Sequence, residues 1–102
     1  MNPDINENPM QDEGMTMLIN RLRKNQRILG KWARHQNIEC FRVYDRDLPE
    51  YAFAIDCYGQ YVQMAEYQAP SEISGEKVSA RRKQAIAAVQ EVFGLPRENI
   101  VL

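Results

Sequence analysis

The sequence lacks any apolar run near the roughly 20 residues that a membrane-spanning helix needs, and it contains only two cysteines. Cys40 and Cys57 are too few to hold a metal ion, and they do not form a Cys-x-x-Cys pair. These absences argue against an integral membrane protein, a disulfide scaffold and a cysteine-ligated metal site. We expect both cysteines to be buried thiols, with a disulfide conceivable only if they lie on neighbouring strands.

The chain has 102 residues, enough for one domain, and its 44 % hydrophobic and 26 % charged residues are typical of a folded globular protein. Residues 1–13 contain four acids, two prolines and no base, which is the composition of a linker and not of a secretory or mitochondrial leader. We therefore predict a disordered acidic linker over residues 1–13, a single domain over residues 14–102 and a cytoplasmic location.

No acidic residue occurs between Gly14 and Ile38, where apolar residues recur at three- and four-residue steps. This spacing predicts an amphipathic helix, because a rotation of about 100° per residue brings such positions to one face. The predicted apolar face comprises Met15, Leu18, Leu22, Leu29, Trp32 and Ala33, joined by Asn25 and Gln26. We assign Leu29 and Trp32 to the core.

Five bases lie on the opposite arc of this helix, and we call them the basic ridge: Arg23, Lys24, Arg27, Lys31 and Arg34. Ordinary solvated helix faces mix charges of both signs, since like charges four residues apart repel each other. Arg27 stands four residues from both Arg23 and Lys31, so the sequence accepts this repulsion. We interpret the ridge as a surface for a polyanion, with a plain solvated face or contact with an acidic protein surface as alternatives.

The central part of the chain changes to the two-residue alternation that is typical of strands. Three strands are predicted, over residues 40–45, 51–58 and 60–67, and Gly59 permits a tight reversal between the last two. The prediction is an antiparallel meander. Tyr61 and Tyr67 share one strand face, for which packing is the favoured role and stacking on unpaired bases the alternative.

The loop over residues 45–50 gathers acids around Pro49. Its Asp-x-Asp spacing does not develop into a calcium loop, because the sixth and twelfth positions hold Glu50 and Asp56 where Gly and Glu are needed. We expect the Asp side chains to bond local backbone in a turn. A paired-carboxylate acid–base site and contact with a basic partner are the alternatives, and we assign no metal ligand and no catalytic residue.

A second helix is predicted from Ser74 as N-cap to Gly94, and Pro96 blocks its continuation. Its first turns carry a secondary basic cluster: Lys77, Arg81, Arg82 and Lys83. Bases at this end do not complement the helix dipole, which favours a functional use. The apolar residues 100–102 resemble the beginning of a strand, which suggests a truncated chain. The predicted fold class is α+β: helix, three-stranded antiparallel meander, helix and short final strand.

Three segments carry a resemblance to a known family: Asn20 to Asn25 (NRLRKN), Leu29 to Ala33 (LGKWA) and Tyr44 to Tyr51 (YDRDLPEY). They resemble the start of the second half of the bifunctional large-subunit ribosomal RNA guanine methyltransferases of Gram-negative bacteria. The resemblance implies an accessory subdomain before a domain that uses S-adenosyl-L-methionine to methylate guanine N7, whereas the N-terminal half methylates another guanine at N2. It also implies ribosomal RNA and the adjoining methyltransferase domain as partners.

The sequence contains no Gly-rich strand-to-helix turn and no Asp-Pro-Pro or Asn-Pro-Pro-Tyr motif. Such a turn is how methyltransferase folds hold their cofactor. We therefore expect S-adenosyl-L-methionine to bind the parent protein and not this segment, which would position RNA without catalysing methylation. The alternatives are a free-standing RNA- or ribosome-binding module and a structural spacer between two catalytic domains.

Overall fold

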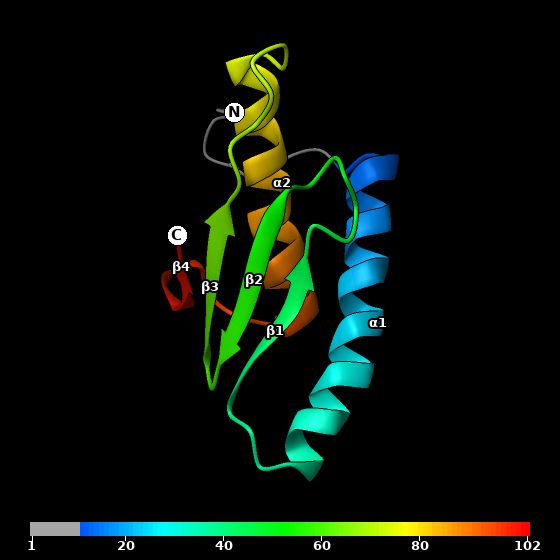
Figure 1. Cartoon of the computed structure of the whole chain (residues 1–102), viewed down its shortest axis with the longest axis vertical. Helices are drawn as coiled ribbons and strands as arrows, with labels where there is room; N and C mark the ends of the chain where they lie inside the picture. Colours follow the sequence, from blue (N-terminus) through cyan, green and yellow to red (C-terminus); the bar gives the residue numbers. More distant parts are fainter. Residues whose placement is uncertain (1–10) are drawn as a thin grey trace, which may run out of the picture.

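The computed structural model describes residues 11–102, which form a two-layer α+β arrangement (Figure 1). The elements in chain order are α1 (Glu13–His35), β1 (Cys40–Asp45), β2 (Phe53–Tyr58), β3 (Tyr61–Glu66), α2 (Gly75–Phe93), the 3-10 helix η2 (Arg97–Asn99) and β4 (Ile100–Val101). This order confirms the predicted fold class. The linker predicted over residues 1–13 lies largely outside the described residues, but Asp12 and Glu13 belong to the start of α1.

The four strands lie in the order β1-β2-β3-β4. The first three pair antiparallel as predicted, and β4 joins the edge of β3 in parallel through the pair Val62 and Ile100. A bulge in β1 between Arg42 and Tyr44 leaves Val43 out of the regular pairing. Because a bulge turns consecutive residues toward the same side, Val43 and Tyr44 are both buried although they are neighbours.

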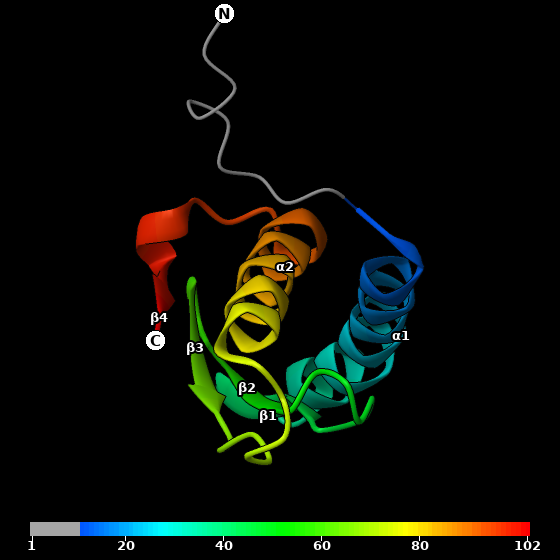
Figure 2. The same cartoon turned by 90° about the horizontal axis from the view of Figure 1, so that it is seen from above.

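Both helices lie on one side of the sheet, α2 over its middle and α1 beside β1 (Figure 2). The core fills the space between the layers and draws Leu18 and Leu22 from α1, Ile55 from β2, Val62 from β3 and Val89 from α2. Each such side chain contributes about 1.5–3 kcal/mol when it leaves water. Burial of apolar side chains therefore fixes which face of α1 points inward and which faces solvent.

The helix ends follow from local chemistry. Ser74 Oγ accepts a hydrogen bond from the Lys77 amide at 3.2 Å, and Gly94 takes the left-handed conformation at the end of α2 (φ 64°), so both predicted boundaries are confirmed. At the end of α1, Asn37 is left-handed (φ 56°) and the Ile38 amide donates to the Ala33 carbonyl at 2.8 Å, which closes a Schellman motif. Within residues 11–102, neither helix combines the length and apolar character that crossing a membrane requires.

Candidate nucleic-acid interface

The basic ridge lies along the solvent side of α1. Its five residues are all exposed, whereas Leu18, Leu22 and Ala33 on the opposite arc are buried. The geometry follows from helix periodicity, since about 100° per residue separates the two sets. The predicted ridge is thus an accessible strip, and the structure places all five bases on it.

Arg23 forms the edge of the ridge toward α2. Its Nη2 lies 3.2 Å from Glu91 Oε2, and both side chains are half exposed, so solvent screens this ion pair strongly. The other four ridge residues form no ion pair with any carboxylate of residues 11–102. The ridge therefore keeps four uncompensated positive charges.

Asn25 connects α1 to the sheet layer by two hydrogen bonds. Its Nδ2 donates to the Val43 carbonyl at 2.9 Å and to Asp47 Oδ2 at 2.8 Å. The bulge in β1 takes Val43 out of the regular strand pairing, and this carbonyl accepts the Asn25 bond. Asn25 thus ties the helix to β1 and to the following loop.

Trp32 does not belong to the core, and its assignment there was wrong: it is 49 % exposed. The last turns of α1 extend beyond the ends of the strands (Figure 1), so the sheet offers little surface to this part of the helix. Leu29, on the same turn, is half-buried. Helical spacing alone predicted that both side chains are buried, because it could not show where the opposing layer ends.

The secondary basic cluster on α2 does not form one surface. Arg82 Nε lies 2.8 Å from Glu66 Oε1 at the sheet edge, and Arg81 borders a small hollow beneath residues 49–53. Lys83 lines a different hollow, between α2 and Asp12. Only Lys77 and Lys83 are exposed, so this cluster presents two separated charges where the ridge presents four.

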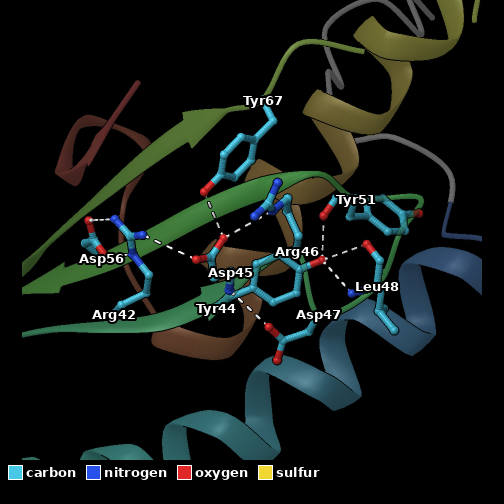
Figure 3. Close-up of polar contacts among 9 residues, drawn as sticks. All are labelled: Arg42, Tyr44, Asp45, Arg46, Asp47, Leu48, Tyr51, Asp56 and Tyr67. Atoms are coloured by element: carbon cyan, nitrogen blue, oxygen red, sulfur yellow. Dashed lines mark hydrogen bonds and ion pairs between the residues drawn. The ribbon is translucent and has the colours of Figure 1, made fainter. Parts of the chain in front are cut away.

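The acidic loop after β1 is an internally bonded turn (Figure 3). Asp47 Oδ1 accepts from the Asp45 amide at 3.0 Å, which confirms the predicted bonding of an Asp side chain to local backbone. Asp45 accepts from the Tyr67 hydroxyl at 2.9 Å, and the Arg46 guanidinium lies over the Tyr67 ring at 4.1 Å. Arg46 has a left-handed backbone (φ 53°), which these contacts help to hold.

Both loop aspartates are thus engaged within the chain. Arg42 lies 3.4 Å from Asp45 Oδ2 and 2.8 Å from Asp56 Oδ1, and the two carboxylates raise the pKa of its guanidinium. Tyr44 donates its hydroxyl to the Tyr51 carbonyl at 2.6 Å, and burial raises the pKa of Tyr44 to about 12. These bonds define the loop as a structural turn, in which Asp45 and Asp47 both have hydrogen-bond partners within the chain.

The two cysteines have different environments. Cys57 is buried, and burial raises the pKa of its thiol to about 11, which keeps it protonated and unreactive. Cys40 is exposed, so the expectation of two buried thiols was wrong for it. The two residues lie on neighbouring strands, but Cys40 pairs with Tyr58 and Phe41 pairs with Cys57, so adjacent positions in the pleat point them to opposite faces.

The fold and the ridge together define a small α+β module with one cationic helix face. The curated proteins that are similar to this chain are named as ribosomal RNA methyltransferases. No protein-family model matches the chain. It is 50 % identical over 90 residues to the ribosomal RNA large subunit methyltransferase K/L of Pseudomonas aeruginosa, covering 88 % of this chain and 12 % of that protein. It is 44 % identical over 100 residues to the protein of the same name from Pseudomonas putida, covering 98 % of this chain and 14 % of that protein. The chain therefore corresponds to a short stretch of these homologous methyltransferases, about an eighth of their length.

Proposed function

We propose that this chain is an RNA-positioning part of a large-subunit ribosomal RNA methyltransferase. The observation that carries the proposal is the basic ridge: four exposed bases without a carboxylate partner among residues 11–102, on a helix segment that contains no acid between Gly14 and Ile38. The similarity to proteins named as ribosomal RNA methyltransferases supports ribosomal RNA as the polyanion.

In this proposal the chain supplies binding and orientation, and the rest of the parent protein supplies catalysis. Lys and Arg contacts to phosphates give affinity without sequence preference, and they fix the register of an RNA on the protein surface. The methylated guanine and S-adenosyl-L-methionine would be held elsewhere in the parent protein. A base must leave its stack to reach an active site, and a surface that holds the flanking RNA assists that step.

The test compares two matched double-lysine variants of the 102-residue chain by fluorescence anisotropy with a labelled hairpin from large-subunit ribosomal RNA. The ridge variant is Lys24→Gln with Lys31→Gln, and the control is Lys77→Gln with Lys83→Gln on α2. All four lysines are exposed, and both variants remove the same two charges. Each lost phosphate contact reduces the slope of log K against log salt by about 0.7–0.9, so the ridge variant should lower the slope by about 1.5.

We expect the ridge variant to bind about tenfold more weakly near physiological salt, and the control to bind close to wild type. Equal losses in the two variants would show undirected electrostatic attraction and would overturn the ridge as the site. A chain that binds no RNA but binds the remainder of the methyltransferase would be a structural spacer, and the proposal would be wrong. The last outcome is that the ridge binds RNA equally well in the isolated chain and in the parent enzyme, while ridge substitutions leave methylation of ribosomal RNA unchanged. In that case a free-standing binding role replaces the positioning role.

A further inference from the structure

Three large apolar side chains remain exposed along one flank of α1, and we call them the apolar flank: Met17, Ile28 and Trp32. Their exposed fractions are 53 %, 54 % and 49 %. Steps of 11 and 4 residues keep all three within about 60° around the helix at about 100° per residue. All three therefore lie on one flank of α1, with Ile28 and Trp32 one turn apart. Met17 lies about 16 Å before Ile28 at about 1.5 Å per residue, and Arg21 and Lys24 lie between them.

The apolar flank borders the basic ridge. Lys31 precedes Trp32 in sequence, and Lys24 lies one turn before Ile28 on the same side of the helix. His35, one turn after Trp32, is also exposed. The ligand that covers this surface must therefore offer negative charge and an apolar face side by side.

An unpaired RNA strand has both properties. Its phosphates match the bases of the ridge, and its unstacked nucleobases present flat apolar faces that aromatic side chains bind. An RNA duplex offers the phosphates but keeps its bases stacked inside, so Trp32 would gain nothing from it. Charge complementarity with a segment free of acids from residue 15 to residue 37 thus favours single-stranded RNA as the occupant.

We infer that Trp32 is a stacking platform for an unpaired nucleotide whose flanking phosphates contact Lys31 and Lys24, the two ridge bases that border the apolar flank. This inference rests on the proposed RNA-positioning function and specifies the part of the RNA that is held: a loop, bulge or displaced strand. The Trp32 side chain is already half exposed and lies outside the buried core, so binding requires no rearrangement of the core.

The chain carries its own probe for this contact, because Trp32 is its single tryptophan. Stacking of a nucleobase on the indole quenches tryptophan emission. The 102-residue chain is titrated with an oligouridylate of about 12 nucleotides and with an RNA duplex of similar length, within the site sizes common for strand-binding surfaces. We expect quenching at saturation by the oligouridylate and little quenching by the duplex.

Variants separate stacking from charge. Trp32→Ala should weaken oligouridylate binding about five- to tenfold, leave duplex binding close to wild type and leave the salt slope unchanged, because stacking releases no counterions. Trp32→Phe keeps a ring and should recover most of the affinity. The matched control is Tyr58→Ala, which removes another exposed aromatic side chain (43 % exposed) at the end of β2 and should leave binding of both RNAs close to wild type.

The outcomes distinguish this inference from the proposed function. If RNA binds with a ridge-dependent salt slope but neither quenches Trp32 nor responds to Trp32→Ala, the stacking inference is wrong and the ridge function stands. If neither RNA binds, both are wrong. If Trp32 emission responds to the remainder of the methyltransferase and not to RNA, the apolar flank is a protein contact, and the inference is overturned.

Discussion

Asn25 offers a direct test of how the ridge is oriented. Its amide nitrogen donates two hydrogen bonds, to the Val43 carbonyl on the bulge of β1 and to the Asp47 carboxylate in the loop after it. Removing the side chain in Asn25→Ala breaks the polar connection between α1, β1 and this loop. The apolar contacts of Leu18 and Leu22 remain, so the chain should still fold.

The expected loss follows from the environment of the two bonds. The bond to Val43 is partly buried and contributes about 1 kcal/mol, with a further penalty where its acceptor stays unsatisfied. The bond to Asp47 is charge-assisted but exposed, and contributes about 0.5–1 kcal/mol. Alanine recovers about 0.5 kcal/mol of helix propensity relative to asparagine. The net loss in the free energy of unfolding is about 1–2 kcal/mol.

Urea denaturation followed by far-ultraviolet circular dichroism measures this loss, and a fall in Tm of about 5–15 °C should accompany it. Gln26→Ala is the control, because Gln26 is also half-buried on α1 and its side chain makes no hydrogen bond within residues 11–102. A double-mutant cycle with Asp47→Ala should give a coupling of about 0.5–1 kcal/mol. An Asn25→Ala variant as stable as the control would refute the idea that this tether fixes the helix.

Two further predictions concern glycine positions and acid stability. Gly30→Ala should stabilise the chain by about 0.5–1 kcal/mol, because the added Cβ meets only the flexible end of Arg34 at 3.4 Å. Gly14→Ala should destabilise the chain by about 1 kcal/mol, because its Cβ lies 3.0 Å from the hydroxyl of the buried Tyr51. Urea titrations in which both variants change the free energy of unfolding in the same direction would contradict this difference. The Met15 amide and then the Gln84 side chain lower the pKa of Asp12, so its contribution to stability is present above the ordinary aspartate pKa of about 4 and is lost as the pH falls through the lowered value. Asp12→Asn keeps a capping oxygen without the charge, and its stability relative to wild type should rise over that acid range; parallel pH profiles of the two proteins would show that Asp12 does not carry the effect.

Local sequence signals predicted the elements because each depends on neighbouring residues. The Ser74 N-cap and the left-handed Gly94 need only the chain around them. The two-residue turn at Gly59 takes a positive φ (58°) at its first position, which is the pattern of a type II′ hairpin turn. The alternation of β2 placed Phe53, Ile55 and Cys57 inward, and all three are buried.

The features that sequence reasoning missed are all long-range. The bulge in β1 shows no local signal, and the Val43 carbonyl that accepts the Asn25 bond belongs to this bulge. The exposure of Trp32 depends on the length of α1 relative to the sheet, which no periodicity encodes. The Asp-x-Asp spacing did indicate a turn, but the contact of Asp45 with Tyr67 joins positions 22 residues apart.

The arrangement of α1 separates stability from binding along a single helix. The arc that contacts the sheet and α2 carries the apolar residues. Apart from the exposed ion pair of Arg23 with Glu91, the ridge contributes like-charge repulsion to the folded state, since Arg27 has Lys31 one turn ahead and Arg23 one turn behind. Replacing Lys24 and Lys31 by glutamine should therefore leave the free energy of unfolding unchanged or raise it by a few tenths of a kcal/mol, while RNA binding weakens about tenfold. A solvated face without a ligand has no reason to retain this repulsion. A variant that is as stable as the wild type or more stable, and that binds RNA more weakly, would thus identify the ridge as a surface retained for a partner.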